Sequence, residues 1–153
     1  MDFGFSRRLL KSIQELESRG RSFALLPPND TKYLEERGFN HSVTQEANMT
    51  CVVFRNFPLP GGFDRPQSDL LLRLSAGYPD VAPDMWWFDP AVKRVDGQAI
   101  PATEVIEHYL GRSWQRWSRH LSAGQWRSGI DGLESFLALI RRELERSVPV
   151  LAR

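Results

Sequence analysis

The chain of 153 residues carries 20 Lys and Arg against 19 Asp and Glu, a formal net charge of +1. This balance provides no overall field that would gather nucleic acid or an anionic membrane. A content of 41% hydrophobic and 25% charged residues is typical of one globular domain. No apolar run approaches the roughly 20 residues of a membrane span, and residues 1–20 do not form a signal-peptide core. We therefore expect a cytoplasmic protein without membrane contact.

Cys51 is the single cysteine of the chain. It has no partner for an internal disulfide and no second thiol for a zinc site, which fits a reducing compartment. We predict no metal site and no cofactor. The segment around Cys51, residues 49–54, is β-rich and apolar, so we expect a buried structural cysteine rather than a nucleophile.

The chain begins with an amphipathic pattern that predicts a helix over residues 1–20. Its apolar positions recur at three- and four-residue steps, and Gly20 is suited to end it. This helix either packs on the sheet of its own domain or docks on a partner or a second copy. We divide the remainder into a domain over residues 26–146 and a tail over residues 147–153.

Two further helices are predicted inside the domain. After the chain break at Pro27-Pro28, Asn29 or Asp30 is expected to cap a short helix that ends at Gly38. A second helix, from Gly132 to Arg146, is expected to be capped by Asp131. Its buried face is predicted to contain Leu133, Phe136, Leu137, Ile140 and Leu144.

Between these helices, β-rich segments are separated by turn residues. Strands are predicted over residues 41–46, 50–57, 68–74 and 85–88, with a proline- and glycine-rich loop over 58–66. The segment from Asp89 to Leu110 is expected to be a long irregular stretch of the kind that often carries function. The prediction is an α+β domain: a four-stranded antiparallel meander flanked by helices.

Two stretches point to a known family. The first is the run from Gly77 to Phe88, in which Tyr78-Pro79 and Pro83 stand between the third and fourth predicted strands. Prolines fix their own φ and restrain the residue before them, so this run forms a rigid crossover between strands. The second is the run from Ser113 to His120, followed by Trp126 and a helix.

In this order of motifs the chain resembles the ubiquitin-conjugating superfamily, and most of all its divergent bacterial branch, the prokaryotic ubiquitin-conjugating family E. The resemblance covers about residues 26–144. In the superfamily the catalytic cysteine precedes a tryptophan by eight residues, and eight residues before Trp126 stands Ser118. The sequence also lacks the His-Pro-Asn motif of the superfamily, for which Asp89-Pro90 is the nearest equivalent.

The resemblance implies a carrier that accepts the C-terminus of a ubiquitin-like protein from an adenylating enzyme and passes it to a target protein amine. In bacteria, genes of this kind often lie beside processing peptidases and are sometimes linked to phage defence. With serine in place of cysteine, the carried intermediate would be an oxyester on Ser118. The alternative is an inactive scaffold that has lost its cysteine and only binds the ubiquitin-like protein or its activating enzyme.

The residues around Ser118 favour acyl chemistry. A serine needs a positioned base, and His120 is the first candidate, with His108 reachable only through the fold. Arg119 is the third predicted catalytic residue, because a nearby guanidinium can stabilise an oxyanion. His120 and Ser118 share a face only if this segment is extended.

The predicted binding residues around this site are Arg112, Arg116, Trp114, Trp117, Trp126 and Tyr78. Trp114 and Trp117 are expected mainly to pack, with one of them covering the site. The interleaved Arg and Trp residues of positions 112–119 also leave open a module that stacks single-stranded nucleic acid. The near-neutral charge and the lack of a second basic run count against nucleic acid as a partner.

Overall fold

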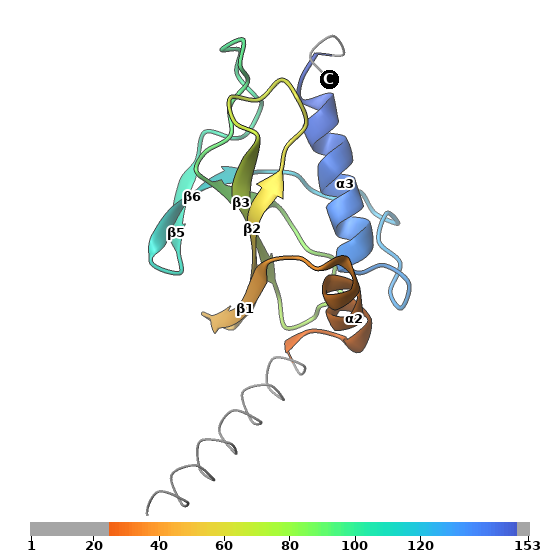
Figure 1. The fold of residues 1–153 in the computed structure, drawn as a ribbon. Helices are drawn as coiled ribbons and strands as arrows, with labels where there is room; N and C mark the ends of the chain where they lie inside the picture. The colour runs from red at the N-terminus through yellow and green to blue at the C-terminus, as the bar shows by residue number, and fades with distance from the viewer. Residues whose placement is uncertain (1–24, 150–153) are drawn as a thin grey trace, which may run out of the picture.

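The structure is a computed structural model in which residues 25–149 are described (Figure 1). The predicted helix of residues 1–20 and the end of the predicted tail lie outside the described residues. The elements of the described part are α2 (Pro28–Arg37), β1 (His41–Glu46), β2 (Met49–Pro58), β3 (Gln67–Leu74), β4 (Trp86–Asp89), β5 (Ile106–Tyr109), β6 (Arg112–Trp117) and α3 (Leu133–Arg146). Within residues 25–149, neither helix has the length and apolar character that crossing a membrane requires.

The described strands form one antiparallel sheet in the order β1-β2-β3-β4-β6-β5. The prediction of an α+β domain with an antiparallel sheet is confirmed. The predicted count of four strands is wrong, because β5 and β6 extend the sheet beyond β4. The predicted loop over residues 58–66 does connect β2 to β3.

The two unpredicted strands form a hairpin. Part of the segment from Asp89 to Leu110, expected to be irregular, is strand β5, and Tyr109 faces Arg112 across a two-residue turn. Leu110 and Gly111 in this turn have φ of 56° and 73°, as a type I′ hairpin turn requires. The hairpin escaped prediction because β5 is only four residues long and leucine is not a residue that signals such a turn.

Both helices lie on the same side of the sheet (Figure 1). The predicted apolar face of α3 is confirmed, since Leu133, Phe136, Leu137, Ile140 and Leu144 are all buried. They pack against inward side chains of the strands, among them Trp86, Phe88 and Trp117. We call this side the inner face of the sheet.

The predicted N-caps of both helices are wrong. Helix α2 begins at Pro28 without a side-chain cap, and the N-cap of α3 is Gly132 rather than Asp131. The Asp131 carboxylate instead accepts a hydrogen bond from the Arg127 N–H, at 2.6 Å. The carboxylate of Asp30 accepts the Leu133 N–H at the start of α3, at 2.9 Å, because tertiary packing brings α2 to that helix end.

The opposite side, the outer face, has its own apolar cluster. Cys51, Val53, Leu71, Trp87 and Trp114 are buried there, and no described helix covers them (Figure 1). Their cover is a layer of long side chains. Arg73 lies over the Tyr109 ring at 3.8 Å and Arg112 lies over the Trp114 ring at 4.4 Å.

Candidate functional site

Ser118 follows directly on strand β6 and is half-buried. Its N–H donates to the carbonyl oxygen of Ala102 at 3.0 Å, which ties it to the loop that precedes β5. Its Oγ donates to the sulfur of Met85 at 3.7 Å. Met85 packs on the outer-face cluster, so the Ser118 hydroxyl is directed toward the outer face.

His120 forms a pair with a carboxylate that sequence reasoning did not single out. Its Nδ1 lies 2.6 Å from Oδ1 of Asp84, and both side chains are exposed. The Met85 N–H donates to the carbonyl oxygen of Arg119 at 3.1 Å. Residues 84–85 therefore run beside residues 118–120, and the crossover before β4 supplies one wall of the Ser118 region.

Arg119 fixes the backbone of this region. Its Nε donates to Glu143 of α3 at 3.0 Å, and one terminal nitrogen donates to the carbonyl oxygens of Pro101 and Ser118 at 2.9 and 3.1 Å. The guanidinium also lies over the Trp117 ring at 5.1 Å. These contacts give Arg119 a positioning role: it clamps the Ser118 peptide between α3 and the loop before β5.

Arg112 is occupied by acidic partners. It donates to Asp89 at 2.7 Å and to Asp69 at 3.1 Å. Burial alone would lower the pKa of Arg112, but its hydrogen bonds to these two carboxylates outweigh the burial and raise that pKa. Arg116 forms an ion pair with Glu107 at 3.5 Å. Neither arginine therefore offers an uncompensated charge to an acidic partner.

The tryptophans of β6 are buried on opposite faces. Trp114 belongs to the outer-face cluster and Trp117 to the inner core, as alternation along a strand requires. Their packing role is confirmed by this burial. Neither ring is exposed for stacking with a nucleic-acid base.

Tyr78 and Trp126 belong to a different part of the structure from Ser118. The indole N–H of Trp126 donates to the carbonyl oxygen of Pro79 at 2.8 Å, and the Tyr78 hydroxyl donates to Asp30. Burial and the hydrogen bond to Asp30 raise the pKa of Tyr78. Both side chains hold the Tyr78-Pro79 turn against the helices.

The two remaining histidines are placed away from this arrangement. His108 lies on β5, exposed, with its Nδ1 2.9 Å from the hydroxyl of Ser113 on β6. His41 lies at the start of β1, half-buried, with its Nδ1 3.0 Å from the carbonyl oxygen of Phe39. The structure thus pairs His108 with Ser113 and not with Ser118.

Cys51 is fully buried on β2, as predicted. Burial raises the pKa of its thiol, against a smaller lowering by the neighbouring Arg73. A raised pKa keeps the sulfur protonated, and a thiol is a much weaker nucleophile than a thiolate.

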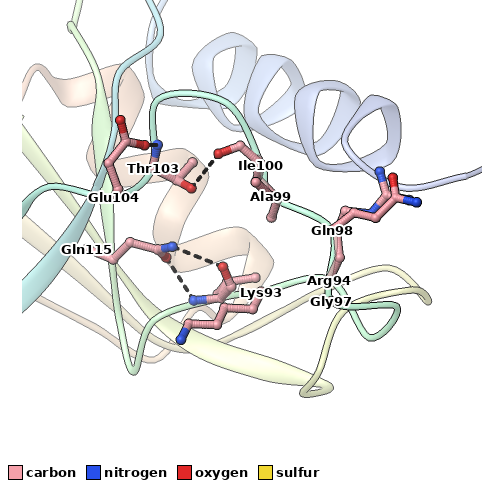
Figure 2. Close-up of a pocket in the computed structure, with 10 residues that line it drawn as sticks. Lys93, Arg94, Gly97, Gln98, Ala99, Ile100, Thr103, Glu104 and Gln115 are labelled. Atoms are coloured by element: carbon pink, nitrogen blue, oxygen red, sulfur yellow. Dashed lines mark hydrogen bonds between the residues drawn. The ribbon is translucent and has the colours of Figure 1, made fainter.

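Two pockets lie near Ser118, on different faces. One, of about 270 Å³, is enclosed by the loop of residues 92–104 and by Gln115 (Figure 2). The Gln115 side chain accepts the Val92 N–H at 2.7 Å and donates to the Val92 carbonyl at 3.0 Å, so it anchors this loop to β6. Thr103 closes the loop by donating to the Ile100 carbonyl at 2.8 Å (Figure 2).

The second pocket, of about 240 Å³, opens on the outer face. It is lined in part by Asp84 and Met85, the residues that contact His120 and Ser118. We call it the outer pocket. Sequence reasoning missed Asp84, Met85 and Arg73, which lines the same pocket, because no local pattern distinguishes them from other crossover and strand residues.

The comparisons with known proteins identify the family. Searches of curated proteins and of solved structures gave no significant match. The sequence model of Prokaryotic E2 family E matches residues 26–147, which is most of the chain and includes every helix and strand from α2 to α3. The protein belongs to Prokaryotic E2 family E, a prokaryotic ubiquitin-conjugating-like family.

Proposed function

We propose that this protein carries a ubiquitin-like protein as an oxyester on Ser118, between an adenylating enzyme and a target amine. Membership of the family supports a ubiquitin-like conjugating role in general. The observation that carries the serine proposal is the His120–Asp84 pair. Met85, the residue after Asp84, contacts both Ser118 and Arg119, so this pair lies close to Ser118.

The pair has the parts that serine activation requires. A weak nucleophile needs a base within reach, and the base needs a third group that orients it. Asp84 engages Nδ1 of His120, which leaves Nε2 as the nitrogen that can take a proton. The Ser118 hydroxyl is held by a thioether sulfur at 3.7 Å, a weak acceptor, so little opposes its rotation toward a base.

The first step forms the ester. Ser118 Oγ attacks the carbonyl carbon of the activated C-terminus, and His120 accepts the hydroxyl proton at Nε2. The new C–O bond forms as the bond to the leaving group of the activating enzyme, AMP or a thiolate, breaks. That group departs with the bonding electron pair, and His120 releases its proton to it or to water.

The second step transfers the acyl group. The nitrogen of the target amine attacks the ester carbonyl, a C–N bond forms, and the C–O bond to Ser118 breaks. Ser118 Oγ leaves with the electron pair, and the proton lost by the amine reaches it through His120. The products are an amide-linked conjugate and the original hydroxyl.

A second candidate function is a scaffold that binds the ubiquitin-like protein or its activating enzyme without forming an ester. The observation that favours it is the direction of the Ser118 hydroxyl, which donates to Met85 and not to His120. Catalytic hydrogen bonds often close only when substrate binds, so the experiment decides between the two.

The test is to incubate the protein with ATP, an adenylating enzyme and a ubiquitin-like protein from the same genome, and to detect an adduct by mass. An oxyester resists thiol reductants and breaks in mildly alkaline hydroxylamine. Ser118→Ala should form no adduct, whereas the matched variant Ser113→Ala, an exposed serine of the same strand region, should form it normally. Tight partner binding without any wild-type adduct would establish the scaffold instead.

A further inference from the structure

The outer pocket contains a guanidinium without an acidic partner. Among the described residues, Arg73 forms no ion pair with a carboxylate; its polar neighbour is the Cys51 thiol, and its Nε is shielded from water without an acceptor. Its Cζ lies over the Tyr109 ring, 3.8 Å from the ring centroid, and 6.0 Å from the centroid of the Trp87 ring. A stacked guanidinium keeps its N–H donors free at the edge, where they suit a carboxylate.

The acidic residues of the same pocket already have hydrogen-bond or ion-pair partners other than Arg73. Asp84 is paired with His120 at 2.6 Å. Glu107 accepts the Trp87 indole N–H at 3.0 Å and forms the ion pair with Arg116. Within residues 25–149, Arg73 is therefore the one cation that lines the outer pocket, and neither of these carboxylates is paired with it.

One more carboxylate lies close to this region. Glu46 accepts the Leu110 N–H, with each of its oxygens 3.1 Å from that nitrogen. It does not line the outer pocket, and its carboxylate is engaged by the Leu110 N–H rather than by Arg73.

The size and position of the pocket indicate what it holds. About 240 Å³ is below the roughly 300–1,000 Å³ of pockets for drug-sized ligands and suits one amino-acid side chain. Met85 forms a wall of the pocket and contacts the Ser118 hydroxyl. An extended chain advances about 3.3 Å per residue, so a tail joined to Ser118 passes this wall within about two residues.

We infer that the outer pocket binds an acidic side chain close to the C-terminus of the ubiquitin-like protein, with Arg73 as its specificity-determining residue. This inference rests on the proposed carrier function, because the ester on Ser118 is what places the tail beside the pocket. The apolar wall of Met49, Val81, Ala82 and Met85 covers the aliphatic part of that side chain.

The test uses two synthetic peptides that differ only in charge: acetyl-Ala-Ala-Glu-Ala-Ala-amide and its Gln counterpart. The terminal amide stands in for the uncharged ester. Binding is followed through the Trp87 indole N–H resonance in ¹⁵N–¹H spectra, because Trp87 lines the pocket. We expect the Glu peptide to bind roughly fivefold or more tightly than the Gln peptide, as one charge-assisted contact provides.

Arg73→Gln should abolish this preference, and Arg73→Glu should reverse it toward acetyl-Ala-Ala-Lys-Ala-Ala-amide. Arg55→Gln is the matched control, an exposed arginine on the neighbouring strand β2, and should keep the preference. The dispersion of the same spectra reports whether each variant is folded. Equal binding of both peptides, no shift at Trp87, or an equal effect of Arg55→Gln would overturn the inference.

Ser118→Ala separates this inference from the proposed function. It should abolish the covalent adduct and leave the peptide preference unchanged. A missing wild-type adduct would therefore count against the proposed carrier function alone. A missing peptide preference would count against the binding of an acidic side chain in the outer pocket alone.

Discussion

The Tyr78 hydroxyl donates a hydrogen bond to Oδ2 of Asp30, and the two residues are 48 positions apart in the chain. The other oxygen of the same carboxylate accepts the Leu133 N–H at 2.9 Å. Asp30 is only 5% exposed. One buried carboxylate thus joins α2, the turn before β4 and the first residue of α3.

Removing this carboxylate should destabilise the fold more than removing one of its donors. Tyr78→Phe deletes a hydrogen bond to a charged group, which costs about 1.5–3 kcal/mol. Asp30→Ala also leaves the Leu133 N–H and the Tyr78 hydroxyl without a partner, so we expect roughly 2–5 kcal/mol. Urea denaturation measures both changes in the free energy of unfolding.

The control for this series is Lys32→Ala, which removes an ion pair whose side chains are 74% and 64% exposed. It should change stability by about 0.5 kcal/mol or less. A loss in Tyr78→Phe as large as that in Asp30→Ala would show that the carboxylate does not support α3.

Gly132→Ala should destabilise the protein through a specific collision. A Cβ at this position would lie 2.7 Å from Oδ1 of Asp30. The backbone there is extended, with φ of −159°, so the dihedral itself accepts alanine. We expect a loss of roughly 1–3 kcal/mol, the usual cost of forcing atoms into a packed site.

The collision predicts coupling between the two positions. In an Asp30→Ala background the obstructing oxygen is gone, so Gly132→Ala should cost much less than in the wild-type protein. A double-mutant cycle in urea measures the difference. If the losses of stability in the two single variants are additive, the cost of Gly132→Ala comes from the backbone and not from the contact with Asp30.

Cys51 should resist alkylation in the folded protein. Burial raises the pKa of its thiol, so at pH 8 the sulfur stays protonated and inaccessible, whereas an unfolded thiol has a pKa of about 8.5. The buried, protonated thiol contributes to stability at pH values below the pKa of the unfolded thiol. This contribution is lost as the pH rises through the higher pKa of the thiol in the folded protein. Iodoacetamide labelling should therefore follow unfolding by urea, and rapid native labelling would contradict the burial.

Cys51→Ser should leave any transfer activity intact, because we place Cys51 in the outer-face cluster and not at the site. The variant should lose stability, since a hydroxyl enters an apolar cluster. The measurement is adduct formation at a temperature where circular dichroism shows the variant to be folded. Lost activity in a folded variant would make Cys51 the nucleophile.

Ser118→Cys should restore or strengthen the adduct as a thioester that thiol reductants cleave, because a thiolate needs less help from a base. His120→Ala should slow the serine protein by about 10²- to 10⁴-fold, the typical contribution of a general base, and slow the cysteine variant less. Single-turnover rates measure both. Equal slowing of the two proteins would remove His120 from the role of base.

Asp84→Asn tests the orienting carboxylate separately. It keeps an oxygen near Nδ1 of His120 but removes the charge that stabilises the imidazolium formed during transfer. Its effect on the serine protein should be smaller than that of His120→Ala and should be absent in a His120→Ala background. Independent effects of the two changes would show that they do not act as a pair.

The sequence by itself determined the local elements, because turn chemistry and side-chain periodicity act over a few residues. Gly38 ends α2 in the left-handed conformation, with φ of 66°. The turn residues between the predicted strands of residues 41–46 and 50–57 include Ala47 and Asn48, which join β1 to β2 with φ of 51° and 62°. The spacing of apolar residues along α3 is enough to predict which face of this helix is buried. In the same way, the β-rich apolar run around Cys51 predicts a strand in the core.

Only the tertiary structure decided the pairings between distant segments. Asp30, expected to cap its own helix, supports a helix start 103 residues later. Strand β6 pairs with β4 although the loop of residues 90–105 and strand β5 lie between them in the chain. The His120–Asp84 contact and the outer pocket depend on that same pairing, because β6 brings Ser118 beside the crossover that holds Met85. Such contacts follow from sheet order and packing, which no short window of sequence encodes.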